Sequence, residues 1–183
     1  MNPAPIAIRY ARMRRILLLA TEEILGKVVS PPELYLSQLI HNLEDTFGKP
    51  GGQGLALQIG RVSFKYGLRE FGPELGLLDP AFRLLPHNAR LKEASAVLAG
   101  FFSQLEQDVR VEYEESLQYW HIQQCAICQN RKAESPSCHM VIGFLQEMLN
   151  WVSGGKNFII EETECLARGD SLCTIVVDLH PIG

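Results

Sequence analysis

Residues 162–173 read ETECLARGDSLC, and this stretch predicts how the C-terminal part of the chain folds. Cys165 and Cys173 lie symmetrically about Gly169, so a hairpin centred on that glycine brings the two thiols opposite each other on one face. Two such thiols form half of a tetrahedral metal site, and thiolates together with a carboxylate suit zinc. The stretch therefore predicts two paired strands with a closed, structural zinc site beside them.

Two further ligands are needed to complete that site. Cys138 stands at the start of a predicted helix, and Glu162 lies three residues before Cys165. In a regular strand Glu162 and Cys165 point to opposite faces, so their joint coordination of one ion requires a bulge or a strong twist between them. The bulge is thus a structural condition for this ligand set.

A rival ligand set begins at Cys125 and Cys128, which are separated by two residues and could supply two ligands to Cys165 and Cys173. His139 is a further competitor as a metal ligand. Without a metal, the cysteines would be buried thiols, or Cys165 and Cys173 would form a cross-strand disulfide. Spacing alone leaves these alternatives open.

The first half of the chain shows helical periodicity. Apolar residues recur at steps of three and four, and a capping box at Ser30–Glu33 opens the second segment, whereas Asn88 is the expected cap of the fourth. A break is expected at residues 48–52 and an irregular connection at 72–86, because both are rich in glycine or proline. The predicted helices are residues 8–25, 30–47, 55–71 and 88–105.

The second half is mixed. Alternating patterns predict strands at residues 109–114, 117–123, 157–165 and 172–179, with a polar loop at 125–137 and a helix at 138–152 that ends at Gly154 and Gly155. These elements predict an α+β fold, in which helices pack on a four-stranded, mainly antiparallel sheet. At 183 residues the chain has the size of a single domain.

Composition narrows the class of protein. The net charge of −4 argues against nucleic-acid binding, and the apolar run at residues 16–20 is far too short to span a membrane. No export signal is recognised, so we expect a cytoplasmic protein whose five cysteines bind metal or stay as buried thiols. No nucleophilic triad or dinucleotide fingerprint can be argued from spacing.

Residues 137–177 carry the pattern E-x-x-C-x-A-x-G-D-x-x-C together with Cys138 and the paired glycines after the helix. In these features the segment resembles the vinyl-4-reductase domain family, which includes sensory domains of aromatic-responsive bacterial regulators and whose fold is similar to subunits of a vesicle-tethering complex. The resemblance implies that zinc is held by Cys138, Glu162, Cys165 and Cys173. Cys125 and Cys128 fall outside the matched pattern.

The resemblance also implies an apolar ligand pocket between helices and sheet, in which a histidine and a tryptophan contact the ligand. Candidates for such a pocket are His87, Phe101, Tyr119, Trp120, Phe144 and Trp151. Their local sequences do not align closely with those of the sensors. For Trp120 and His87 the interpretation that we favour is structural: a core aromatic and a capping or loop residue.

We therefore expect a stand-alone sensor or carrier of a small hydrophobic molecule, stabilised by zinc and signalling through a partner protein or a homodimer. Residues 1–47 are the expected dimerisation portion, and residues 88–183 the zinc-binding and ligand-binding core. The alternative is an accessory factor or reductase-like protein in tetrapyrrole or photosystem biogenesis. An enzymatic role comes second, because nothing in the sequence suggests a site for the nicotinamide or flavin that vinyl reduction needs.

Overall fold

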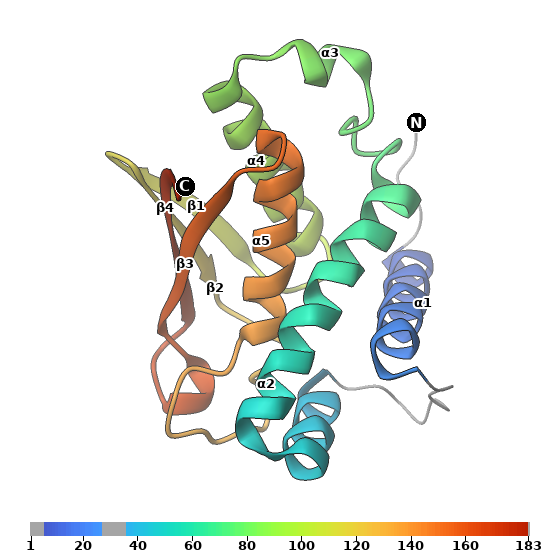
Figure 1. The fold of residues 1–183 in the computed structure, drawn as a ribbon, viewed down its shortest axis with the longest axis vertical. Helices are drawn as coiled ribbons and strands as arrows, with labels where there is room; N and C mark the ends of the chain where they lie inside the picture. Colours follow the sequence, from blue (N-terminus) through green and yellow to red (C-terminus); the bar gives the residue numbers. More distant parts are fainter. Residues whose placement is uncertain (1–5, 27–35, 183) are drawn as a thin grey trace.

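The computed structural model describes residues 6–26 and 36–182. Within these ranges helices and strands follow the order that the sequence predicts, helices first and a mixed region after them (Figure 1). The elements are α1 (Ile6–Leu25), α2 (Leu36–Phe71), α3 (Pro80–Leu84), α4 (His87–Ser103), β1 (Val109–Glu114), β2 (Leu117–Ile122), α5 (His139–Ser153), β3 (Asn157–Glu164), the 3-10 helix η1 (Leu166–Arg168) and β4 (Cys173–Ile182).

In the described residues the strands form a four-stranded antiparallel sheet in the order β1-β2-β4-β3. Figure 1 shows α4 and α5 against one face of this sheet, α2 beyond α5, and α1 on the far side of α2. Burial alternates along β2, so that Gln118, Trp120 and Ile122 face the helices while Tyr119 and His121 face the other way. The predicted α+β architecture is confirmed.

Two glycines set how closely α2 and α5 approach each other. A Cβ atom on Gly143 of α5 would lie 1.9 Å from the carbonyl oxygen of Leu57, and one on Gly60 of α2 would lie 2.0 Å from the carbonyl oxygen of Met140. The helix backbones therefore touch directly at both points, which larger residues would prevent. This contact fixes the position of α5, whose first turn follows Cys138.

Helix boundaries differ from the prediction in detail. The predicted second and third helices are continuous as α2 except at Gly48, whose backbone is not helical (φ 72°, ψ 161°). Pro50 is tolerated just after this break, because the first turn of a helix leaves its N–H groups unpaired. The predicted capping box at Ser30–Glu33 lies outside the described residues.

Other boundaries were also misplaced. The prediction that Asn88 caps the fourth helix is wrong: α4 begins at His87 after Pro86, whose extended backbone ends the preceding segment, and no side chain caps it. The connection at residues 72–86 contains the short α3, which Asp79 caps by accepting from the Ala81 N–H at 2.8 Å. α4 ends at Ser103, two residues before the predicted end.

The C-terminal elements agree with the prediction within a few residues. α5 ends at Gly154 in the left-handed conformation (φ 79°), as the glycine pair predicts, and β4 runs on to Ile182. In the part of the chain that the structure describes, none of the helices combines the length and the apolar character that crossing a membrane requires.

Candidate metal centre and adjoining cavity

All five cysteines are free, buried and gathered at one end of α5, although they come from four different segments. Cys125 and Cys128 stand on the loop that follows β2, and Cys138 immediately precedes α5. Cys165 connects β3 to η1, and Cys173 begins β4. The fold thus concentrates thiols from an interval of 49 residues, counted from 125 to 173, into one cluster.

Four of the thiols contact one another closely. The Sγ atom of Cys128 lies 3.4 Å from that of Cys138 and 3.6 Å from those of Cys165 and Cys173. Cys138 Sγ is 3.6 Å from Cys173 Sγ and 3.5 Å from Cys125 Sγ. The ligand atoms of Cys128, Cys138, Glu162, Cys165 and Cys173 all lie within 4.8 Å of one another, which makes this group able to hold a metal ion.

The bulge that joint coordination requires is present in β3. Glu162 pairs with Ile175 and Glu164 pairs with Thr174, so one extra residue, Thr163, interrupts the register. This irregularity turns Glu162 and Cys165 towards the same cluster. The structural condition that the sequence set for the Glu162 ligand set is therefore met.

The connection between β3 and β4 is more elaborate than a simple hairpin. The chain passes through η1 and turns at Gly169, whose φ is 104°. The Leu166 N–H donates to Cys173 Sγ at 3.3 Å, and the Cys165 N–H donates to the Asp170 carboxylate at 2.7 Å. Backbone amides that donate to a sulfur or orient its residue are the usual outer contacts of metal-bound thiolates.

Burial makes negative charge costly in this cluster. Desolvation raises the pKa of Glu162 to about 8, although its Oε2 atom accepts from the Cys138 N–H at 2.7 Å. Its other oxygen, Oε1, is buried without a hydrogen-bond partner. The hydrogen bond from Cys128 lowers the pKa of Cys125, while that with Cys125 raises the pKa of Cys138. Without a cation these acidic groups cannot all ionise.

A zinc ion fits this cluster. A Zn–S distance of about 2.3 Å gives a tetrahedron with sulfur–sulfur edges of about 3.8 Å, close to the separations of 3.4–3.6 Å found here. Sulfurs this close leave room for one ion. The orphaned Oε1 atom of Glu162 is another sign that a positive partner belongs at this place.

The structure brings together both ligand sets that the sequence left open. Cys138, Glu162, Cys165 and Cys173 meet in the cluster, but Cys128, which the sequence pattern placed outside, meets them there too. His139 does not belong to that group; it is the first residue of α5 and is partly buried, which lowers its pKa. Which of these residues bind an ion stays a prediction at this point.

An apolar cavity of about 90 Å³ adjoins the cluster, between α1, α2, α5, β2 and the cysteine-bearing loop. Cys125, Ala126 and Ile127 form the wall on the side of the loop. The cluster and the cavity therefore share this loop. The other lining residues are Met13, Leu17, Leu36, Gly60, Ser63, Phe102, Gln107, Val109, Trp120, Ile122, Met140, Val141, Phe144 and Leu145.

Two polar atoms belong to residues that line this apolar cavity and lack partners. Trp120 is 2% exposed and Ser63 is 4% exposed, and neither the indole Nε1 nor the hydroxyl Oγ has a hydrogen-bond partner. Buried polar atoms without partners are rare in native proteins and call for an explanation. A ligand with a polar group is one such explanation.

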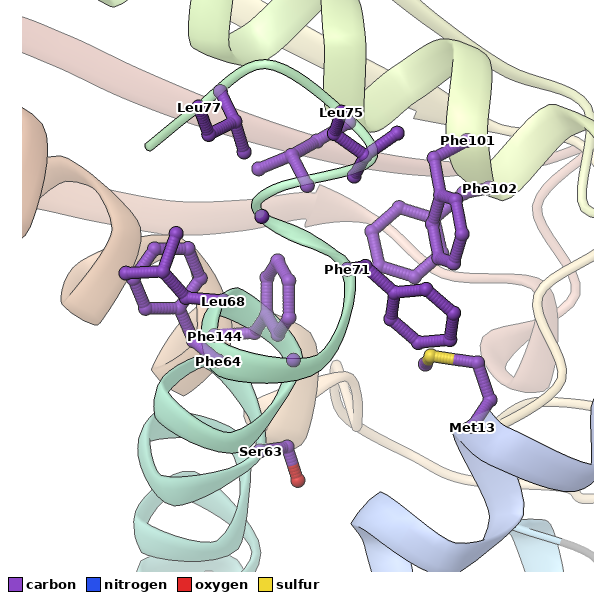
Figure 2. Close-up of a pocket in the computed structure, with 13 residues that line it drawn as sticks. Met13, Ser63, Phe64, Leu68, Phe71, Leu75, Leu77, Phe101, Phe102 and Phe144 are labelled. Carbon is purple, nitrogen blue, oxygen red and sulfur yellow. The ribbon is translucent and has the colours of Figure 1, made fainter. Parts of the chain in front are cut away.

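A smaller cavity of about 20 Å³ lies next to the first and shares Met13, Ser63, Phe102 and Phe144 with it. Figure 2 shows its walls: Phe71, Phe101 and Phe102 on one side, Phe64, Leu68 and Phe144 on the other, and Ser63 on α2 beneath them. It has room for about one water molecule, but its lining is almost wholly apolar, so it acts as a dry extension of the larger cavity.

The candidate pocket residues divide into two groups. Phe101, Trp120 and Phe144 line one or both cavities. The lining of the two cavities does not include the other three. His87 is at the start of α4 beside Asn88 (Nδ1 to Oδ1, 3.3 Å), Tyr119 stacks on His121 on the opposite face of the sheet, and Trp151 stacks on Phe82 at 5.8 Å.

Sequence reasoning missed Ser63 and the loop wall at residues 125–127. Ser63 lies among apolar residues of a predicted helix, and a single hydroxyl there gives no signal by itself. Only the packing of α2 against α5 and the sheet shows that it is buried beside a cavity.

Comparisons with known proteins agree with this architecture. Residues 119–179 match the family model of the vinyl-4-reductase domain, which confirms the resemblance that the sequence pattern predicts. No curated protein matches the chain.

Two solved structures are similar in fold. The crystal structure of the phenol-responsive sensory domain of the transcription activator PoxR with phenol aligns with a TM-score of 0.56 and 19% identity, covering 82% of this chain and 77% of that one. Subunit 3 of a trafficking protein particle complex from Naegleria fowleri, covalently bound to palmitic acid, aligns with a TM-score of 0.49 and 13% identity, covering 93% and 96%. At this identity the first alignment shows that the fold is shared.

Proposed function

We propose that this protein is a receptor for a small, mainly apolar molecule with one polar group, which binds in the 90 Å³ cavity, and that a zinc ion in the thiol cluster supports the fold. The observation that carries the proposal is the pairing of an apolar cavity with two buried, unpartnered polar atoms, Trp120 Nε1 and Ser63 Oγ. Pockets that are mainly apolar with a few polar groups are typical of small-molecule sites.

The cavity volume limits the size of the ligand. An apolar cavity of about 150 Å³ binds benzene in another protein. At about 90 Å³ this cavity suits a single ring or a short chain after a small outward shift of its walls, with the smaller cavity as added space. A tetrapyrrole is far larger, so the cavity does not favour the alternative role in tetrapyrrole biogenesis.

The unpartnered atoms favour a hydroxylated ligand. A buried polar group without a partner costs about 1–3 kcal/mol, which a ligand offsets when it supplies the missing hydrogen bond. The indole N–H of Trp120 donates, and the Ser63 hydroxyl both donates and accepts, so a phenolic hydroxyl satisfies both. The phenol in the sensory domain of similar fold supports this choice of ligand class.

Zinc has a structural role in this proposal. A closed site in which protein side chains fill all four positions leaves none for a substrate, and it ties the loop, α5, β3 and β4 together. Cys138, Cys165 and Cys173 belong to the ligand set that the resemblance implies, together with Glu162. Buried, free thiols in a metal site suit a reducing compartment, and we accordingly place the protein in the cytoplasm.

Signal output in this proposal passes through a homodimer or a partner protein. The described part of the N-terminal portion supports this, because α1 exposes Ile6, Ile8 and Tyr10. Exposed apolar side chains on one helix are suited to burial against a second chain. Analytical ultracentrifugation of wild type and an Ile8→Glu variant tests it, and we expect the variant to be more monomeric.

Isothermal titration of the zinc-loaded protein with phenol and with toluene tests ligand binding. We expect phenol to bind more tightly than toluene, by about fivefold for one recovered hydrogen bond. Trp120→Phe keeps an aromatic ring but removes the N–H, so it should reduce the preference for phenol while leaving toluene binding nearly unchanged. Tyr119→Phe, on the opposite face of the sheet, is the control. Absence of binding of either compound at millimolar concentration would rule out this ligand class.

A further inference from the structure

The identity of the fourth metal ligand follows from the geometry of the thiols. Three candidates, Cys138, Cys165 and Cys173, belong to the set that the family resemblance implies, and a tetrahedral ion takes one more ligand. The structure offers two side chains for that position, Cys128 and Glu162, whose ligand atoms both lie within 4.8 Å of the other three.

Cys128 is the better placed of the two. Its Sγ atom is 3.4, 3.6 and 3.6 Å from the Sγ atoms of Cys138, Cys165 and Cys173, so it makes a tetrahedral edge to each of the three shared ligands. Thiolate is also the ligand that zinc prefers over carboxylate in closed sites. Glu162 already has a different task, because its Oε2 atom accepts from the Cys138 N–H at 2.7 Å.

The loop that carries Cys128 is held in place by contacts with other elements. The Cys128 N–H donates to the Cys125 carbonyl at 3.0 Å, and the Ala133 N–H donates to the Ala167 carbonyl of η1 at 2.8 Å. Arg131 forms an ion pair of 2.8 Å with Glu44 of α2, and their side chains are only 10% and 17% exposed. Cys128 therefore reaches the cluster from an anchored turn.

The same turn forms part of the cavity. Cys125, Ala126 and Ile127 line it, and Cys128 follows directly in the chain. A ligand bond to Cys128 thus restrains the backbone that closes the cavity on this side. Loop 125–137 contains no helix or strand, so side-chain anchors determine its position.

We propose that Cys128 is the fourth zinc ligand of this protein, in place of Glu162, and that the metal thereby fixes the cavity wall formed by residues 125–127. This inference rests on the proposed zinc site. Glu162 then orients Cys138 through its backbone amide, as an outer contact of the metal centre.

X-ray absorption at the zinc edge tests the ligand assignment on the intact wild-type protein loaded with one equivalent of zinc. We expect four sulfur neighbours at about 2.3 Å. Three sulfurs with one oxygen at about 2.0–2.2 Å would overturn the assignment while leaving the zinc site itself intact. Failure of the protein to bind zinc would instead remove the site on which both proposals depend.

Cobalt substitution assigns the ligands one by one. Cys128→Ser should lose about a quarter of the thiolate-to-cobalt charge-transfer absorbance, because one of four thiolates is gone, whereas Glu162→Gln should retain it. Cys125→Ser is the matched control on the same turn and should also retain it. Loss of the tetrahedral spectrum in Glu162→Gln together with an unchanged Cys128→Ser spectrum would contradict the proposal.

Hydrogen–deuterium exchange tests the effect on the cavity wall without any ligand. In wild type we expect zinc to slow exchange of the amides of residues 128–133 as well as those around Cys138, Cys165 and Cys173. In Cys128→Ser the protection of 128–133 should disappear, with β1 as an internal reference. Zinc-dependent protection of 128–133 that is equal in both proteins would show that the metal does not hold the wall through Cys128.

Discussion

Replacing Gly143 by alanine perturbs the contact that positions the metal centre and the cavity together. Gly143 lies on α5 against the backbone of α2, and a Cβ atom there would stand 1.9 Å from the Leu57 carbonyl oxygen. Contacts below 3.0 Å are essentially never made by real Cβ atoms, so this contact must lengthen by more than 1 Å. A carbonyl within a helix cannot rotate away, and the two helices must therefore separate.

The energetic cost follows from what that separation disturbs. Over-packing a well-packed interior costs about 1–3 kcal/mol when a side chain can adjust, and here only backbone can move, so we expect about 3 kcal/mol or more. This is a large part of the roughly 5–15 kcal/mol that typically stabilises a domain. The shift also moves Met140, Val141 and Phe144 in the cavity wall, so phenol affinity should fall as well.

Urea unfolding followed by circular dichroism measures this cost. Gly100→Ala on α4 is the control, because a Cβ atom there meets nothing within 4 Å; it should stabilise the protein by about 0.5–1 kcal/mol through the higher helix propensity of alanine. A Gly143→Ala protein within about 0.5 kcal/mol of wild type would refute the reasoning, because that is the range of neutral surface substitutions.

Three further predictions concern the cluster and the cavity. Burial raises the pKa of Glu162 from its usual 4.5 to about 8, so the metal-free folded protein keeps a proton that the unfolded chain releases. Its stability should fall as pH rises from about 4.5 to 8, a fall that Glu162→Gln reduces and that zinc reverses because binding releases protons; thermal melts across this range measure both. Cys165→Ser should lose zinc and much stability in metal analysis and melting, whereas Cys125→Ser should keep both; equal losses would favour a ligand set that includes Cys125. Ser63→Ala should stabilise the ligand-free protein by about 1 kcal/mol in urea unfolding, since it removes an unpaired hydroxyl, while weakening phenol binding in calorimetry.

Much of the fold could be predicted from local patterns. The order of the elements, the antiparallel sheet and the end of α5 at Gly154 follow from periodicity and glycine placement, which depend on neighbours in the chain. The cap of α4 could not be predicted so simply, because Pro86 and Asn88 compete to define the same boundary and the helix starts between them. The break in α2 was expected across five residues but is confined to Gly48.

The candidate site was predictable only in part. The spacing around Gly169 indicates the two thiols of β3 and β4, and the need for a bulge near Thr163 could be stated in advance because side chains alternate along a strand. The arrival of Cys128 in the cluster could not, since an irregular loop has no period from which its path can be worked out. The same limit explains why His87, Tyr119 and Trp151 are outside the cavities.

By itself, the sequence determined the α+β class, the thiol pair about Gly169 and the likeness to the vinyl-4-reductase family, because each depends on residues close together in the chain. Tertiary structure alone decided that Cys128 joins the cluster and that Ser63 and Trp120 border one cavity. These juxtapositions arise where α2 and α5 touch backbone to backbone at Gly60 and Gly143 and where the loop is anchored to Glu44. Such contacts join residues distant in sequence, and packing forces rather than local propensity bring them together.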